Sequence, residues 1–234
     1  MIEFVPLADT GRRYSVDYTV RLGDVGTDGV IRLDGVARQL QDVATDDWED
    51  TGAASSDVWV VRRTAVRLAV DGRWPTYKER VTVTTWCAGV GAAWAERRTN
   101  ISIDGRLMIE AAALWVPVDL SGHPVRIRPE FFEIYGEAVR GRKISGRLPR
   151  PVVDPSATSR PWPLRRADLD VVGHVNNAAV WQAVTEVEPE KTTGVVVTHY
   201  GPIEDRDAVT LANTVDRLWL TVNDSIQVAA EFSS

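Results

Sequence analysis

The 234-residue sequence contains one cysteine, three histidines and no apolar run of 18 or more residues. A single cysteine excludes an internal disulfide framework. Cys87 lies in the apolar run VTVTTWCA, which predicts a buried, unreactive thiol. No segment is apolar enough to span a bilayer as a helix, and residues 1–16 lack the pattern of a secretion signal. We therefore expect a cytoplasmic protein.

Metal-binding and nucleotide-binding motifs are also missing. His123, His174 and His199 lie far from one another and from the cysteine, without the spacings that hold zinc. No serine-hydrolase, phosphate-loop or dinucleotide motif occurs. We expect no cofactor.

Basic residues are outnumbered, because the net charge is −6. This balance argues against nucleic-acid binding. Basic side chains nevertheless gather, with no acidic residue between them, at Arg140, Arg142, Lys143, Arg147 and Arg150. The cluster is either a solvated linker or a docking surface for an acidic partner.

The first half of the chain reads as one helix and several strands. A strand is predicted over 14–22, and an apolar stripe at helical spacing predicts a helix over 33–49 that Gly52 ends. Extended segments follow at 59–70, 79–88, 92–103 and 107–118. Asp71-Gly72 and Asp104-Gly105 are predicted hairpin turns, so the segments form an antiparallel meander. The helix and the sheet must bury their apolar faces against each other.

The same order of elements returns after a segment with weak patterning, 129–163, in which we interpret VVDPSATSRPWP as a linker or an edge crossing. A short strand is predicted at 162–166, and a helix over 177–188 follows a turn. The remaining strands are predicted at 194–200, 208–222 and 225–232. The sequence therefore predicts an α+β protein built from two similar units.

The turns before the two predicted helices can be aligned without a gap, residues 21–33 on 165–177. Asp24 then falls on Asp168, and Gly29 on Gly173. The second copy alone carries polar groups at four further places, namely Asp170, His174, Asn176 and Asn177, where the first has Gly26, Val30, Arg32 and Leu33. We infer one working site per chain, in the second copy.

The second turn contains the groups that acyl transfer needs. A helix start presents free N–H groups and a positive dipole end, which stabilise an oxygen that becomes negative. A carboxylate such as Asp170 beside it can attack a carbonyl or remove a proton from water. The same residue types are common in capping turns, so the segment by itself leaves a purely structural role open.

The pattern D-x-D-x-x-G-H-V-N-N before a helix resembles the active-site turn of hotdog thioesterases. The segments LQDVATDDWEDTG, WVVRRTAVRL, WPTYKERVTVTTW and AALWVPVDLSGHPVRIRPE are similar to the acyl-acyl-carrier-protein thioesterases, over about residues 12–232. That family fuses two hotdog domains, each a long central helix wrapped by an antiparallel sheet. The resemblance implies hotdog domains at 1–135 and 161–234, joined by a linker at 136–160.

The resemblance also implies roles for individual residues. Asp170 matches the catalytic carboxylate and His174 the family histidine. The N–H of Asn177 or its neighbour would polarise the thioester carbonyl. Gly173, Asn176, Asn177 and Val172 would contact the substrate, and Glu204 would be a water-orienting base.

Three positions depart from the family pattern. Val172 replaces an asparagine, Ile203 replaces a glutamate beside Glu204, and Val180 stands in place of a tyrosine. These changes leave the proton route open, while the simpler chemistry of an aspartate beside a helix start is unaffected by them.

The implied function is hydrolysis of fatty acyl thioesters of acyl carrier protein, with the first hotdog contributing to the acyl pocket. The basic cluster would dock the carrier protein. Acyl-coenzyme A hydrolysis, a hydratase or dehydratase activity, and acyl binding without turnover are the alternatives, the last favoured by Val172 and Ile203. The sequence leaves the acyl length open, and also whether the chain is a monomer or a homodimer.

Overall fold

The computed structural model describes residues 2–53, 58–119, 121–149, 151–171 and 173–234. The helices are α1 (Leu33–Asp50), α2 (Pro129–Val139) and α3 (Asn177–Glu186), with the short 3-10 helices η1 (Leu22–Asp24) and η2 (Arg166–Asp168). The strands are β1 (Tyr14–Thr19), β2 (Val58–Leu68), β3 (Arg80–Val90), β4 (Ala95–Ile103), β5 (Arg106–Val118), β6 (Thr158–Pro161), β7 (Gly194–His199), β8 (Val209–Asn213), β9 (Arg217–Val222) and β10 (Ser225–Ser233).

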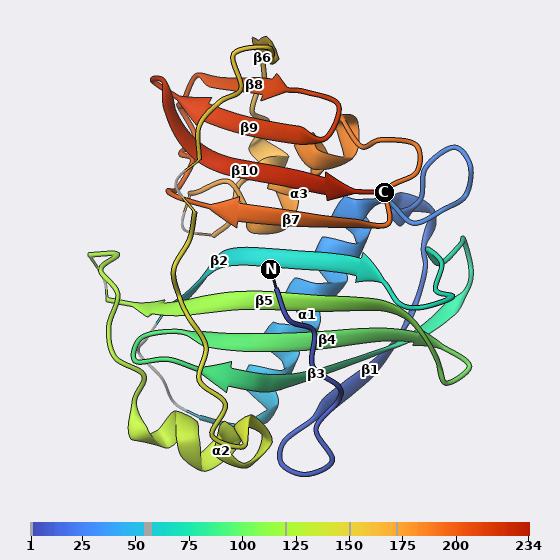
Figure 1. Cartoon of the computed structure of the whole chain (residues 1–234), viewed down its shortest axis with the longest axis vertical. Coiled ribbons are helices and arrows are strands. Elements are labelled where there is room, and N and C mark those ends of the chain that lie inside the picture. Colours follow the sequence, from blue (N-terminus) through green and yellow to red (C-terminus); the bar gives the residue numbers. More distant parts are fainter. Residues whose placement is uncertain (1, 54–57, 120, 150, 172) are drawn as a thin grey trace.

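All ten strands join in one antiparallel sheet with the order β1-β3-β4-β5-β2-β7-β10-β9-β8-β6. The first half of the chain supplies β1 to β5 and the second half β6 to β10. The halves meet where β2 pairs with β7, with Thr64 opposite Val197. The sheet is therefore continuous across the repeat (Figure 1).

Helices α1 and α3 lie side by side behind the sheet in Figure 1. Val36 and Val43 of α1 and Trp181 and Val184 of α3 are each at most 2% exposed and belong to one hydrophobic cluster. That cluster also contains residues from strands of both halves. The two repeats thus share a core, and the expected burial of helix against sheet is confirmed.

Helix α2 is a finding that the sequence reading missed, because it lies at the start of the segment 129–163, where the patterning is weak. Pro129 at its start fixes a helical backbone angle, and Arg140 ends it in the left-handed conformation. Phe131 and Tyr135, four residues apart, are buried on one side of α2 against Trp59 and Trp48. The division at residues 135 and 160 remains a prediction.

The segment after α2 returns along the face of the sheet opposite to α1 and α3 (Figure 1). Pro149, Pro151 and Val152 there line a broad hollow together with residues of β2, β7 and β10. The N-terminal segment lies on the same face, where Phe4 packs on the Arg67 guanidinium.

Three strand predictions need correction. Residues 162–165 are not a strand; β6 precedes them. The segment 208–222 is two strands, β8 and β9. Asp71-Gly72 does not join paired strands, since β2 pairs with β5 and β7 while β3 pairs with β1 and β4. Asp104-Gly105 does form the predicted hairpin, with both residues at positive φ.

Within the described residues, none of the helices combines the length and apolarity that crossing a membrane requires.

Candidate active site

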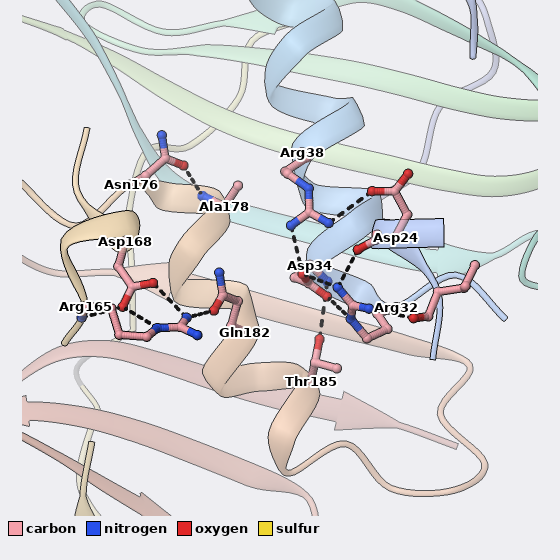
Figure 2. A network of polar contacts seen from close by, with 12 residues as sticks. Asp24, Arg32, Asp34, Arg38, Arg165, Asp168, Asn176, Ala178, Gln182 and Thr185 are labelled. Atoms are coloured by element: carbon pink, nitrogen blue, oxygen red, sulfur yellow. Dashed lines mark hydrogen bonds and ion pairs between the residues drawn. The ribbon is translucent and has the colours of Figure 1, made fainter. Parts of the chain in front are cut away.

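The turn before α3 is held by its own main chain and by a buried carboxylate. Asp168, 4% exposed, accepts hydrogen bonds from the backbone N–H and the guanidinium of Arg165 (Figure 2). Leu169 pairs with Val175, and Gly173 sits at φ +86°, a conformation that glycine adopts without strain. Asp168 therefore builds the turn and is not exposed to a substrate.

The turn before α1 repeats this main-chain pattern residue for residue, as the gapless alignment predicts. In the first copy Arg32 N–H donates to the Asp24 carbonyl, and in the second Asn176 N–H donates to the Asp168 carbonyl, both at 2.8 Å. Gly29 and Gly173 both have positive φ. The two turns are thus structural copies that differ in side chains.

Asp170 and His174 face each other across the second turn. The Asp170 N–H donates to the His174 carbonyl at 2.8 Å, and the His174 N–H donates to Asp170 Oδ1 at 3.1 Å. Asp170 is half-buried, whereas the His174 side chain is exposed. The turn thus fixes the carboxylate of Asp170 through a main-chain donor.

Glu204 lies opposite His174 through an isolated antiparallel bridge. Next to it, Ile203 is buried, and its carbonyl accepts from the Val175 N–H at 2.8 Å. Sequence reasoning placed Glu204 near the turn, and the structure brings it there, with an exposed side chain. Val172 lies outside the described residues.

Asn176 and Asn177 open α3. Asn176 is the N-cap, and its Oδ1 accepts from the Ala178 N–H at 2.8 Å (Figure 2). Among the described residues, the N–H groups of Asn177 and Ala179 find no hydrogen-bond partner. A helix start therefore offers two donors beside the polar turn.

A small cavity of about 40 Å³ begins at this helix start. Asn177, Ala178 and Trp181 of α3 line it together with Ala37, Leu40 and Gln41 of α1. The sheet side combines the larger Val61, Arg97 and Trp115 with small residues, namely Thr64, Thr99, Ala111 and Ala113, which leave space that larger side chains would fill. Asp170, His174 and Glu204, all described, are not among its lining residues.

A second cavity of about 220 Å³ lies farther along α1, within the first half of the chain. Ala44, Thr45 and Trp48 of α1 line it, with Trp59 of β2 and Phe131 of α2. Arg97 and Trp115 line both cavities. From Ala37 to Trp48 the helix spans roughly 16 Å at its usual rise per residue. The two cavities therefore lie one after the other along one side of α1. The first is at the start of α3, and the second is farther from it.

The start of α1 differs from that of α3 in its side chains, whereas the N–H groups of Leu33 and Gly35 lack a partner among the described residues, as those of Asn177 and Ala179 do. The Asp34 N–H donates to Thr185 Oγ1 at 3.3 Å, and the Asp34 carboxylate, 3% exposed, pairs with Arg32 and Arg38 (Figure 2). These guanidiniums lower the pKa of Asp34 against the opposing effect of its burial. A fixed negative charge thus occupies the helix start where the second copy has Ala178.

The basic cluster is less available than the sequence suggested. Arg142 pairs with Glu96 at 2.6 Å, and Arg140 pairs with Asp9 at 3.1 Å. Lys143 and Arg147 are exposed, while Arg150 lies outside the described residues. Arg142 therefore serves the packing of its segment against β4.

Sequence reasoning missed the polar side chains beneath the site. Asp47, 1% exposed, joins Arg12, Arg97 and Tyr135 in one hydrogen-bonded network. His199 is buried beside Arg62, and burial, with Arg62, lowers its pKa to about 4. No group of three or more metal-ligating side chains occurs in the described part of the chain.

Comparisons with known proteins agree with these features. A family model described as the acyl-ACP thioesterase N-terminal domain matches residues 11–135, and the C-terminal domain model matches residues 154–204. An uncharacterized protein of Mycobacterium tuberculosis (strain CDC 1551 / Oshkosh) is 26% identical, over 98% of this chain and 95% of the relative.

Two plant proteins are also similar. Oleoyl-acyl carrier protein thioesterase 1 of Arabidopsis thaliana is 23% identical over 82% of this chain and 59% of its own length. The fold matches that of the 12:0-ACP thioesterase from Umbellularia californica with a TM-score of 0.79 and 19% identity, over 94% of this chain and 96% of that one.

Proposed function

Because the chain belongs to the acyl-ACP thioesterase family and is a thioester hydrolase, we propose that it hydrolyses fatty acyl thioesters of acyl carrier protein to free fatty acids at the start of α3. The proposal rests on the arrangement of residues at the start of α3. Asn177, whose N–H has no partner among the described residues, directly follows the turn with Asp170 and also lines the small cavity along α1.

The start of α3 would bind the thioester carbonyl oxygen. The N–H of Asn177, at the first helical position, is free to donate, and the helix dipole places positive potential there. During attack on the carbonyl carbon this oxygen becomes negative, and donors already in place stabilise it without reorganisation. Ala178 is less suited, because Asn176 already accepts from its N–H.

Asp170 would supply the base or the nucleophile. As a base, its carboxylate takes a proton from water while the water oxygen bonds to the carbonyl carbon; the C–S bond then breaks, and the thiolate leaves with that proton. As a nucleophile, it bonds to the carbonyl carbon and expels the thiolate to form an anhydride; water then hydrolyses the anhydride, which regenerates the carboxylate, releases the fatty acid and supplies the proton that the thiolate takes up. His174 and Glu204, both exposed at the same turn, would orient the water or the leaving thiol.

The two cavities along α1 would hold the acyl chain. They lie between α1 and the sheet of the first hotdog, whose own helix start carries the buried Asp34 carboxylate. This division supports an acyl-binding first half and a catalytic second half. The exposed Lys143 and Arg147 remain our candidates for docking the acidic carrier protein.

The test is thiol release from acyl carrier protein and coenzyme A thioesters of 8 to 18 carbons, measured side by side. We expect release from both, with the larger kcat/KM for the carrier protein. Equal values would remove the carrier-protein preference. Loss of an enoyl double bond without free thiol would indicate a hydratase. The absence of thiol release at every chain length would indicate a protein that binds acyl chains without hydrolysing them.

A further inference from the structure

The two cavities meet at two side chains that can donate hydrogen bonds. Arg97 of β4 and Trp115 of β5 each line both cavities. Most other lining residues are apolar or small. A chain that enters at Asn177 and continues to Trp48 must pass this pair. We call Arg97 and Trp115 the donor junction.

Trp115 is the unusual member of the donor junction. Its Nε1 is buried and has no hydrogen-bond partner among the described residues. Two other tryptophans, by contrast, are satisfied: Trp74 Nε1 donates to the Thr192 carbonyl at 3.2 Å and Trp94 Nε1 to the Ile144 carbonyl at 2.9 Å. A buried donor without an acceptor costs about 1–3 kcal/mol, so such groups are rare unless something else satisfies them.

Arg97 keeps the donor junction charged. Its Nη1 pairs with Asp47 at 2.6 Å, and its Nη2 contacts Tyr135 Oη at 3.4 Å. Burial lowers the pKa of Arg97, but the charges of Asp47 and Tyr135 outweigh this and raise it overall. The guanidinium is thus fixed between the cavities.

A plain hydrocarbon chain fits this junction poorly. Its methylenes would cover the Trp115 N–H without accepting from it, which leaves the desolvation of this donor uncompensated, whereas the guanidinium already has Asp47 and Tyr135 as partners. An oxygen on the chain would accept from the indole and lie beside the positive charge.

Resting on the proposed function, we propose that the preferred substrate carries a hydroxyl or keto oxygen partway along its acyl chain, and that the Trp115 Nε1–H binds this oxygen beside Arg97. The substrate class is then an oxygenated fatty acyl thioester. Trp115 is the specificity-determining residue for it.

The experiment compares 12-carbon acyl thioesters that carry one hydroxyl at successive positions from C5 to C12 with the unsubstituted chain. In the native protein, kcat/KM should be about 5- to 100-fold higher for one hydroxyl position than for the plain chain, the range expected when a buried donor gains its acceptor. Trp115→Phe keeps an aromatic ring without the N–H and should reduce this ratio to about 1.

Trp59→Phe is the matched control, because Trp59 lines only the second cavity. It should keep the ratio of the native protein. A native ratio near 1 at every position, or a ratio that Trp115→Phe leaves unchanged, overturns the proposal.

Binding of the free acids separates this proposal from the proposed function. Calorimetry with the hydroxylated and plain 12-carbon acids should show the same preference, again lost in Trp115→Phe. If no thioester is hydrolysed but the preference in binding persists, the proposed hydrolysis is wrong and the proposed binding of a chain oxygen by Trp115 is supported. Equal affinities for both acids in the native protein would refute the donor junction whatever the turnover.

Discussion

Asp170 and Gly26 make the same main-chain hydrogen bond in the two turn copies. Each N–H donates to the carbonyl oxygen four residues later, at 2.8 Å to His174 and at 2.9 Å to Val30. Glycine therefore supports this bond as well as aspartate does. A carboxylate also accepts from the N–H of that later residue in both copies: Val30 donates to Asp28 Oδ1 at 2.9 Å, and His174 donates to Asp170 Oδ1 at 3.1 Å. The second turn thus differs in carrying its carboxylate two positions earlier, at Asp170.

His174→Ala should lower kcat/KM for acyl thioesters by about 10- to 1000-fold, the range of a positioned acid–base group. The alanine keeps the backbone N–H that donates to Asp170, so the carboxylate stays oriented. Thiol release and thermal unfolding should be measured together. A rate close to the native one would mean that the imidazole takes no part in proton transfer.

Gly26→Asp should not create a second site. At the start of α1 the Asp34 carboxylate and its two guanidiniums stand where the second copy has Ala178, and Leu33 replaces Asn177. We expect the double variant Gly26→Asp, Asp170→Asn to release thiol no faster than Asp170→Asn alone. Recovered turnover would show that the first copy can form an oxyanion site.

Ala113→Phe should fill the first cavity. We expect a loss of at least about 10-fold in kcat/KM for chains of 12 or more carbons, with a smaller loss for a butyryl thioester, because only long chains extend past the start of α3. Ala229→Phe is the control, since Ala229 lines the hollow on the opposite face of the sheet. An equal loss for short and long chains would argue against an acyl path along α1.

His199 should make the protein less stable in acid. Burial, with Arg62, lowers its pKa to about 4, whereas in the unfolded chain it is near 6.5. Between these values the unfolded state binds the proton and the folded state does not, so the free energy of unfolding falls as pH falls from 6.5 to 4, by ~3 kcal/mol.

Denaturant unfolding at several pH values measures how the free energy of unfolding depends on pH. The fall in this free energy between pH 6.5 and 4 should be present in the native protein and absent from His199→Gln. The difference between the two proteins isolates His199, because Glu188, whose pKa burial and Asp28 raise to about 7, contributes an opposite slope in both. Parallel curves for the two proteins would contradict the assignment.

Local patterns predicted much of the fold. The apolar stripe that starts at Leu33 gave α1 to within one residue at each end, and the gapless alignment of the turns matches the hydrogen bonds at Asp24 and Asp168. The predicted meander was only partly right, because strand order depends on contacts between distant segments. β2 pairs with β5 and β7, and no local sequence pattern predicts these pairings.

The candidate site, like the fold, could be predicted from the sequence only in part. Asp170, His174, Asn176 and Asn177 lie in one turn and could be found from the sequence. Trp115 and Arg97 meet the start of α3 only through the packing of α1 and α3 on the sheet. Their place between two cavities is a property of the folded chain. Helix α2 carried a helical signal at Phe131 and Tyr135, but it was too short to stand out among the prolines and arginines that follow.

Asp170→Asn tests the central claim most directly. Asparagine keeps an oxygen that accepts from the His174 N–H but can neither attack the thioester nor take a proton from water. With an acyl carrier protein thioester of the preferred length, we predict that kcat/KM for thiol release falls at least ~100-fold while thermal unfolding stays as in the native protein. Thiol release within two-fold of the native rate would contradict the account.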